Sequence, residues 1–234
     1  MRKILILNSK GGCGKSTIAT NLAAYLAHSG HSTSLLDYDK QGSSMNWLKQ
    51  RPEHKPQIHG IAANKNRTDV TLSFQMRLPA KADWVVLDAP AGVTGFTLRD
   101  YVRRVDGIII PVLPSPIDIH ATAGFIKELL LVGRARATDT KIAVVANRVR
   151  QNADVYQPLQ LFLNSLKLPF LGTLHSSMDY VRAAECGLGI HELDNPRCPE
   201  SCDQWIPIAQ WLETLSGNTQ NQSISSIFPS YAHN

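Results

Sequence analysis

The chain has 234 residues, of which 43% are hydrophobic and 18% are charged, and its formal net charge is +5. This length and composition are typical of one globular domain with a sizeable core. No stretch approaches the roughly 18 consecutive apolar residues that a membrane span needs, and Asn8 and Lys10 interrupt the first apolar run, which excludes a signal peptide. We therefore expect a cytoplasmic protein, and the positive charge mildly favours an anionic partner such as nucleic acid.

Short apolar runs alternate with amphipathic segments along the chain, and they predict buried strands and helices in turn. In chain order the predicted elements are a strand at 3–8, a helix at 15–29, a strand at 33–38, a helix at 42–50, a strand at 57–61, a helix at 70–77, a strand at 84–87, a helix at 96–104, a strand at 107–113, a helix at 118–133, a strand at 141–146, a helix at 152–166, a strand at 169–172, and helices at 180–186 and 204–215. This alternation predicts an α/β fold with a doubly wound, mostly parallel sheet and helices on both faces.

Two regions depart from the alternation. Residues 51–70 are basic and weakly patterned, whereas the end of the chain is rich in Ser, Asn and Gln and is nearly uncharged. A polar segment of low charge favours a loosely ordered tail. We therefore expect a single domain over residues 1–215, followed by a tail over residues 216–234.

The most informative stretch is NSKGGCGKST at residues 8–17, between the first predicted strand and the first predicted helix. A glycine-rich turn lets backbone N–H groups point at a phosphate, and the positive end of the following helix points to the same place. Lys15 can reach the β- and γ-phosphates, Ser16 offers a hydroxyl to Mg²⁺, and Thr17 can hold the α-phosphate. The strand, glycine loop and helix together predict a nucleotide-binding loop.

Carboxylates follow two of the other predicted strands. Asp88 ends an apolar strand, which is where phosphate-loop NTPases place the residue that binds the Mg²⁺ ion through water. Asp37 and Asp39 alternate at the end of another strand, so one can point into the site while the other supports the loop. Because ligands of such sheets bind at the carboxyl ends of the strands, all three are expected near the glycine loop.

Four stretches together resemble the ParA/MinD family of ATPases. The loop has Ser9 where the usual phosphate loop has its first glycine and carries a second lysine, Lys10, so that it matches the family's deviant Walker A motif K-G-G-x-G-K-[ST]. The stretch LLDYDKQGSSMNWL resembles the family's second acidic motif. DWVVLDAPAG resembles its Walker B segment with the following switch, and IIIPVLPSPIDIHAT is similar to the strand and loop that come next. The resemblance covers residues 1–215 and is closest to compact ParA proteins without an N-terminal DNA-binding domain.

The resemblance implies roles for individual residues. ATP would bind Lys10, Gly11, Gly12, Cys13, Gly14, Lys15, Ser16, Thr17 and Asn147, of which the last would read adenine. Mg²⁺ would bind Ser16 and Asp88, and the catalytic residues would be Lys10, Lys15 and Asp39. In the family two ATP-bound subunits face each other, the residue matching Lys10 reaches the partner's phosphates, and the residue matching Asp39 handles the attacking water. Lys40 replaces the family's usual proline, which adds charge near the site and loosens the backbone there.

The function implied is a slow, Mg²⁺-dependent ATPase that forms an ATP-sandwich homodimer and binds nucleoid DNA without sequence preference. An adaptor protein would stimulate hydrolysis, and the cargo would be a plasmid or chromosome locus, or a protein assembly such as a carboxysome or chemoreceptor cluster. DNA binding needs several cations close to phosphates. The candidates are Arg134, Arg136, Lys141, Arg148, Arg150 and Arg182.

Other functions remain open at this point. A MinD-like membrane-bound regulator would need a basic amphipathic helix at the C-terminus, and the last residues contain no Lys or Arg. An iron–sulfur electron carrier would need cysteines between Cys13 and Cys186, where there are none. A small-molecule kinase or ligase would use a substrate pocket instead of a partner subunit, and Lys10 argues against it. Another regulatory phosphate-loop ATPase that does not bind DNA is the remaining alternative. The pair Cys198 and Cys202 matches no strong zinc pattern, so we expect no metal site there.

Overall fold

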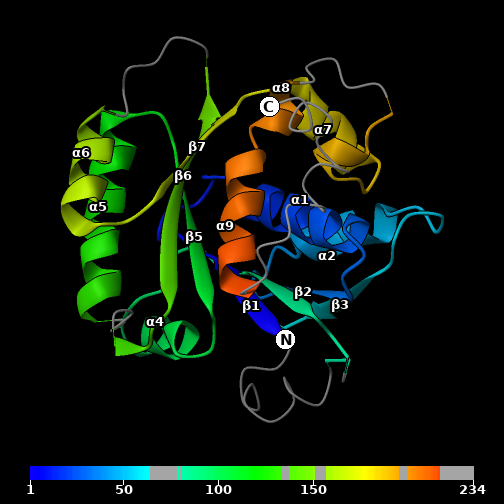
Figure 1. Cartoon of the computed structure of the whole chain (residues 1–234), viewed down its shortest axis with the longest axis horizontal. Coiled ribbons are helices and arrows are strands. Elements are labelled where there is room, and N and C mark those ends of the chain that lie inside the picture. The colour runs from blue at the N-terminus through cyan, green and yellow to red at the C-terminus, as the bar shows by residue number, and fades with distance from the viewer. Residues whose placement is uncertain (64–77, 80, 133–136, 151–156, 195–199, 217–234) are drawn as a thin grey trace.

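The computed structural model describes the chain except residues 64–77, 80, 133–136, 151–156, 195–199 and 217–234 (Figure 1). In the described part, parallel strands form one sheet in the order β3-β2-β4-β1-β5-β6-β7. The strands are β1 (Arg2–Ile6), β2 (Thr33–Asp37), β3 (Ile58–Ala62), β4 (Trp84–Asp88), β5 (Gly107–Val112), β6 (Lys141–Val149) and β7 (Phe170–His175). The predicted doubly wound α/β fold is therefore confirmed.

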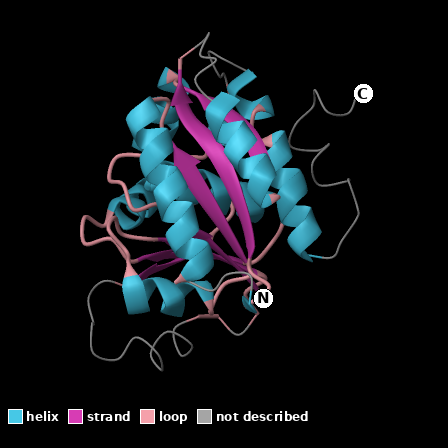
Figure 2. Ribbon diagram, turned by 90° about the vertical axis from the view of Figure 1, so that its left-hand side faces the viewer, coloured by secondary structure: helices cyan, strands magenta, loops and turns pink. Residues whose placement is uncertain are grey.

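Helices cover both faces of this sheet. They are α1 (Lys15–His28), α2 (Ser43–Gln50), α4 (Gly95–Val102), α5 (Pro116–Leu131), α6 (Gln157–Leu166), α7 (Met178–Glu185), the 3₁₀ turn η3 (Ile190–Glu192), α8 (Glu200–Asp203) and α9 (Ile206–Ser216). Figure 2 shows the strands between the two helical layers. Within the described residues, none of these helices combines the length and the apolarity that crossing a lipid bilayer would require.

The core has two halves, one on each side of the sheet. One hydrophobic cluster joins the strands to α1, α2 and α9, and it includes Leu22, Trp47 and Leu212. The other joins the strands to α4, α5 and α6, and it includes Phe125 and Leu163. The residues of β2 and β4 are buried throughout, because both faces of a parallel sheet are covered by helices.

The topology gathers the strand ends that the sequence singled out. The strand β1 lies at the centre of the sheet, between β4 and β5. The strands β2 and β3 lie beyond β4, and the strands β6 and β7 lie beyond β5. The register pairs Ile6 with Asp88 and Asp88 with Asp37, so these residues end their strands at one level. In doubly wound sheets the crevice at the carboxyl ends of such strands is where ligands bind.

Element boundaries moved by a few residues from the prediction. The structure starts α5 at Pro116, because the Ser115 hydroxyl accepts from the backbone N–H of Asp118 and caps the helix. It starts α7 at Met178, where Ser177 caps in the same way. The strands β6 and β7 run longer than predicted, to Val149 and His175. The predicted helix over 70–77 and the predicted tail beyond Ser216 lie outside the described residues.

Candidate nucleotide-binding site

The glycine-rich loop connects β1 to the start of α1. Gly12 and Gly14 adopt positive φ angles of 75° and 90°, which other residues rarely do. A Cβ atom at Gly14 would also lie 2.1 Å from Nδ2 of Asn147. Gly11 and Gly12 are exposed, so their backbone can meet a ligand next to the N-terminus of a buried helix. This arrangement suits a phosphate group.

The two lysines of the loop point in different directions. Lys15 is only 7% exposed, and its Nζ donates to the backbone oxygen of Lys10 at 2.9 Å, inside the loop. The side chain of Lys10 is 42% exposed, and its Nζ forms an ion pair with Oδ1 of Asp118 in the first turn of α5. The hydrogen bond from Lys10, followed by that from Ser115, lowers the pKa of the Asp118 carboxyl. The loop therefore presents one enclosed cation and one outward cation.

Cys13 occupies the centre of the loop and is buried. Its thiol lies 3.4 Å from the backbone oxygen of Lys10, and burial raises the pKa of this thiol. A buried thiol with a raised pKa is mostly protonated at neutral pH and is a poor nucleophile. Its position supports the loop, and the effect of the Lys15 charge, which lowers the pKa of the thiol, is smaller than the effect of burial.

Asp88 is a fully buried carboxylate at the end of β4. The residue is 0% exposed, and its Oδ2 accepts from the Ser44 hydroxyl at 2.7 Å. Its Oδ1 is buried and has no hydrogen-bond partner among the described residues. Burial raises the pKa of Asp88 to about 6, against the opposing effect of the Ser16 and Ser44 hydroxyls. A carboxylate oxygen without a partner beside a serine hydroxyl fits Mg²⁺, which prefers oxygen ligands.

Asp37 and Asp39 make different contacts. Asp37 is 0% exposed, and its two oxygens accept from the backbone N–H groups of Asp39 at 3.0 Å and Met45 at 3.1 Å. Asp39 is partly exposed, and its Oδ1 accepts from the backbone N–H of Gln41 at 3.0 Å. Asp37 therefore shapes the loop that carries Asp39, and Asp39 lies just beyond the carboxyl end of β2.

Two asparagines hold the nucleotide loop from behind. Asn147 is 5% exposed, and its Nδ2 donates to the backbone oxygen of Cys13 at 2.8 Å. Asn8 donates to the backbone oxygen of Pro111 at 2.7 Å and accepts from the backbone N–H of Lys10 at 3.1 Å. From the sequence, Asn147 is expected to contact adenine, and Asn8 has no predicted role in the site. The signal available for Asn8 was a lone polar residue at the end of a buried strand.

The candidate DNA-binding residues do not form one surface. Lys141 opens β6, whereas Arg148 and Arg150 lie at its other end, and the seven strand steps from Lys141 to Arg148 correspond to roughly 23 Å. Arg148 has a φ angle of 57° at an irregularity in the pairing of β6 with β7, and it is exposed between two buried neighbours. Arg182 bonds to Asp179 within α7. The remaining two, Arg134 and Arg136, lie outside the described residues.

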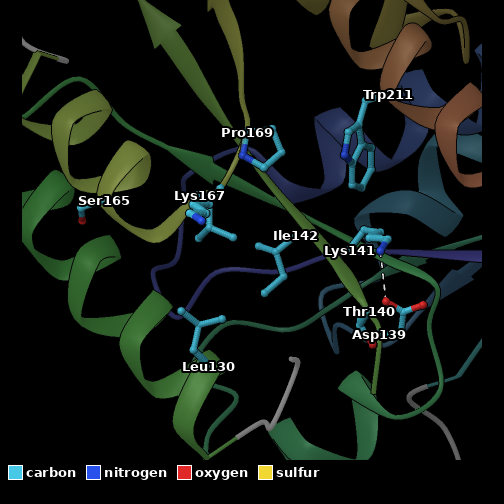
Figure 3. Close-up of a pocket in the computed structure, with 10 residues that line it drawn as sticks. Leu130, Asp139, Thr140, Lys141, Ile142, Ser165, Lys167, Pro169 and Trp211 are labelled. Atoms are coloured by element: carbon cyan, nitrogen blue, oxygen red, sulfur yellow. Dashed lines mark hydrogen bonds and ion pairs between the residues drawn. The ribbon is translucent and has the colours of Figure 1, made fainter. Parts of the chain in front are cut away.

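Lys141 borders a hollow at the edge of the sheet opposite the nucleotide loop. This hollow has a volume of about 620 Å³ and lies among α5, α6, α9 and the start of β6. Figure 3 shows Lys141 beside Asp139, with Trp211 of α9 also at the hollow. The Lys141 ammonium and the Asp139 carboxylate form an exposed ion pair at 3.0 Å. Lys141 therefore belongs to a different surface from the arginines at the end of β6.

Comparison with known proteins agrees with this site. The profile of the CobQ/CobB/MinD/ParA nucleotide binding domain matches residues 4–190. The Maintenance of carboxysome distribution protein A of Halothiobacillus neapolitanus is 31% identical over 176 residues, which are 73% of this chain and 77% of that protein. The Cytosolic Fe-S cluster assembly factor NUBP2 homolog of Dictyostelium discoideum is 29% identical over 196 residues, which are 79% of this chain and 71% of that protein.

A partition protein and two solved structures complete the comparison. The Chromosome-partitioning ATPase Soj of Thermus thermophilus is 30% identical over 154 residues, 55% of this chain and 61% of that protein. Apo McdA of Cyanothece has a TM-score of 0.72 at 16% identity, covering 91% of this chain and 99% of that one. MinD of Aquifex aeolicus has a TM-score of 0.66 at 19% identity, covering 92% and 97%. Because the profile match spans well over half of the sequence, the chain belongs to the CobQ/CobB/MinD/ParA family of nucleotide-binding proteins.

Proposed function

We propose that this protein is a ParA-type ATPase that dimerises around ATP, binds DNA without sequence preference and positions a cargo through partner-stimulated hydrolysis. The observation that carries the proposal is the difference in exposure and contacts between the two lysines of the loop. Lys15 is enclosed within its own loop, while Lys10 extends outward at 42% side-chain exposure. A single active site needs only the enclosed lysine, so the outward one is available to a second nucleotide.

The chemistry assigned to the site follows from its placement. The backbone of the loop and Lys15 bind and orient the phosphates of ATP, where a triphosphate concentrates negative charge. Asp39, partly exposed at the same edge, orients the attacking water and accepts its proton. Ser16 and Asp88 would hold Mg²⁺, which when bound neutralises phosphate charge. Asn147 supports the loop and lies beside Gly14. We propose that Asn147 also contacts adenine, as the sequence predicts.

Apolar side chains at the same edge support a second copy as the partner. Phe96, Ile117 and Met178 are 87%, 76% and 62% exposed, and they lie in the first turns of α4, α5 and α7. Helices that follow parallel strands begin at the carboxyl edge of the sheet, so these side chains lie at the same edge as the nucleotide loop. Large exposed apolar residues that gather around one site mark an interaction surface. In a symmetric dimer, Lys10 of each subunit would face the other subunit's phosphates.

The relatives support a positioning function without deciding the cargo. Their names describe carboxysome distribution in one case and chromosome partitioning in another. We propose that this chain likewise uses nucleoid DNA as its track, and that an adaptor protein stimulates hydrolysis. The DNA contacts are assigned to Arg148 and Arg150, which share the nucleotide edge, and not to Lys141.

DNA binding tests this proposal directly. The purified protein is mixed with two unrelated DNA duplexes, with ATP, with ADP or without nucleotide, at 50 and 200 mM salt. We expect binding that needs ATP, is equal for the two duplexes and weakens steeply as salt rises, because phosphate neutralisation releases counterions. Absence of binding in every nucleotide state would contradict the proposal.

Matched variants locate the surface. Replacing Arg148 and Arg150 by Gln should weaken binding to both duplexes and reduce the salt slope by about one for each lost phosphate contact. Lys141→Gln should bind as the wild type does, because Lys141 lies at the opposite end of β6. A stronger effect of Lys141→Gln than of the arginine pair would move the DNA surface to the amino edge.

A second function is favoured by one comparison. The similarity to the NUBP2 homologue extends over more of this chain than that to Soj, and its name describes iron–sulfur cluster assembly. Among the described residues, no group of three or more His, Cys, Asp or Glu side chains could hold a metal ion. Anaerobic incubation with iron and sulfide, followed by absorption spectroscopy, separates the two functions. A stable cluster together with no DNA binding would make the assembly function the better account.

A further inference from the structure

Ser44 makes a buried contact with the site that neither the loop motif nor the acidic motif explains. Its hydroxyl donates to Oδ2 of Asp88 at 2.7 Å, and both residues are 0% exposed. The two residues come from different elements, since Ser44 lies in α2 and Asp88 ends β4. The contact therefore joins the helix that follows Asp39 to the carboxylate assigned to the cation.

The contact leaves the two oxygens of Asp88 in different states. Oδ2 is held by Ser44, whereas Oδ1 is buried without a partner among the described residues. Burying an acceptor oxygen without a hydrogen bond costs free energy of folding. A buried oxygen of this kind therefore indicates that a ligand binds there. Fixing one oxygen also fixes the direction of the other, which is how residues behind a metal ligand tune its affinity.

We propose that Ser44 is a positioning residue that orients Asp88 so that its free oxygen faces the nucleotide-bound cation. This inference rests on the proposed function, because it takes Asp88 as the ligand of that cation. Ser44 itself touches neither the cation nor the nucleotide in this role. Its hydroxyl decides only where the carboxylate points.

Hydrogen bonds hold the helix that carries Ser44 at two points. In its first turn the backbone N–H of Met45 donates to Oδ2 of Asp37 at 3.1 Å. In the middle of the helix Nε1 of Trp47 donates to the backbone oxygen of Leu188 at 3.2 Å. A positioning group needs rigid support of this kind if it is to hold a ligand within a fraction of an ångström.

A purely local role for the Ser44 hydroxyl is excluded by the same geometry. Serine near a helix start commonly caps it, but the N-cap of α2 is Gly42, and the backbone N–H of Met45 in the first turn donates to Asp37. The neighbouring Ser43 is exposed, although it has the same side chain and lies one residue earlier. Ser43 is therefore a matched control for Ser44, because the two serines differ in that only Ser44 is buried against Asp88.

The experiment separates cation binding from nucleotide binding. Affinity for a fluorescent ADP analogue is measured first in EDTA, and Mn²⁺ is then titrated into the nucleotide complex and followed by electron paramagnetic resonance. Ser44→Ala should weaken Mn²⁺ binding by about 10- to 100-fold, as loss of a residue behind a metal ligand does. The same variant should bind the nucleotide in EDTA within about twofold of the wild type, which also shows that it is folded. Ser43→Ala should leave both affinities unchanged.

Asp88→Asn distinguishes the failure of this inference from the failure of the proposed function. If Asp88→Asn loses Mn²⁺ binding but Ser44→Ala keeps the wild-type affinity, Ser44 does not position Asp88 and only this inference is overturned. If Asp88→Asn keeps wild-type Mn²⁺ affinity, Asp88 is not the ligand, and this inference fails together with the metal role that the proposed function gives to Asp88, whereas the DNA-binding test of the proposed function stands apart. Equal weakening of Mn²⁺ binding by Ser43→Ala and Ser44→Ala would likewise overturn the role given to the buried hydroxyl.

Discussion

At the scale of single residues, Lys10 is already engaged before any partner arrives. Its ammonium pairs with Asp118, whose other oxygen accepts from the Ser115 hydroxyl. An ion pair that is partly exposed contributes about 0.2–1 kcal/mol. In the dimer that we propose, Lys10 would have to leave this carboxylate to reach the partner's nucleotide, so the pair would oppose dimerisation weakly in each subunit.

Asp118→Asn should therefore lower the ATP concentration at which half of the protein is dimeric by about two- to fivefold. The reason is that it removes the carboxylate that competes with the partner's nucleotide for Lys10. Sedimentation velocity with a non-hydrolysable ATP analogue measures the monomer–dimer ratio. Asp139→Asn, which breaks an exposed pair at the other edge of the sheet, is the control and should have no effect. Weaker dimerisation of Asp118→Asn would mean that the carboxylate guides Lys10 toward the partner and does not restrain it.

At the scale of elements, α2 is tied to η3 by a buried ion pair. The Arg51 guanidinium, just after α2, contacts the two oxygens of Glu192 at 2.8 and 2.7 Å, and both side chains are almost completely buried. The segment around η3 also bonds to α1, where Asn21 accepts from the backbone N–H of Ile190 at 2.7 Å. The helix behind the nucleotide loop and the helix behind Asp39 are thus fixed to one common element.

Glu192→Gln should destabilise the fold by roughly 3–5 kcal/mol, because it leaves the Arg51 charge buried without its counter-charge. Urea unfolding followed by circular dichroism measures the free energy of unfolding. The control is Asp100→Asn, which breaks an exposed pair with Arg104 on α4 and should change stability by less than about 0.5 kcal/mol. Similar losses in the two variants would show that burial does not distinguish the pairs.

At the scale of the whole molecule, two buried groups give opposite pH dependences of stability. Burial raises the pKa of Asp88 to about 6, so between about pH 4 and 6 the folded state binds more protons and stability falls as pH rises. Burial lowers the pKa of His191 to about 4, so between about pH 4 and 6.5 the unfolded state binds more protons and stability rises with pH. Over this shared range the two contributions oppose each other.

Replacing either residue should leave only the pH dependence of stability that the other contributes. Between pH 4 and 6, His191→Gln should make the slope of unfolding free energy against pH more negative, and Asp88→Asn should make it more positive. Each change is bounded by about 1.4 kcal/mol per pH unit for one proton. Urea unfolding at four pH values gives the slopes, and exposed His120→Gln should match the wild type. A change of the same sign in both variants would contradict the assignment.

Much of the fold could be predicted because its signals are local. Continuous apolar runs mark strands that are covered on both faces, and the described strands occur where the runs predicted them. The glycine loop was recognisable because Gly12 and Gly14 are required by backbone angles that few other residues adopt. Helix starts were less certain, since the caps Ser115 and Ser177 compete with many other serines that cap nothing.

The alternation of strands and helices, the position of the phosphate loop and the presence of an additional lysine could therefore be predicted from the residues alone. Contacts between groups far apart in the chain become evident only in the folded protein, such as those of Ser44 with Asp88, Arg51 with Glu192, and Asn147 with the loop at Cys13. The tertiary structure also divided the basic residues between the two ends of β6. The reason is that strand and turn patterns follow from neighbouring residues, whereas these contacts depend on strand order and register, which are settled when the whole core packs.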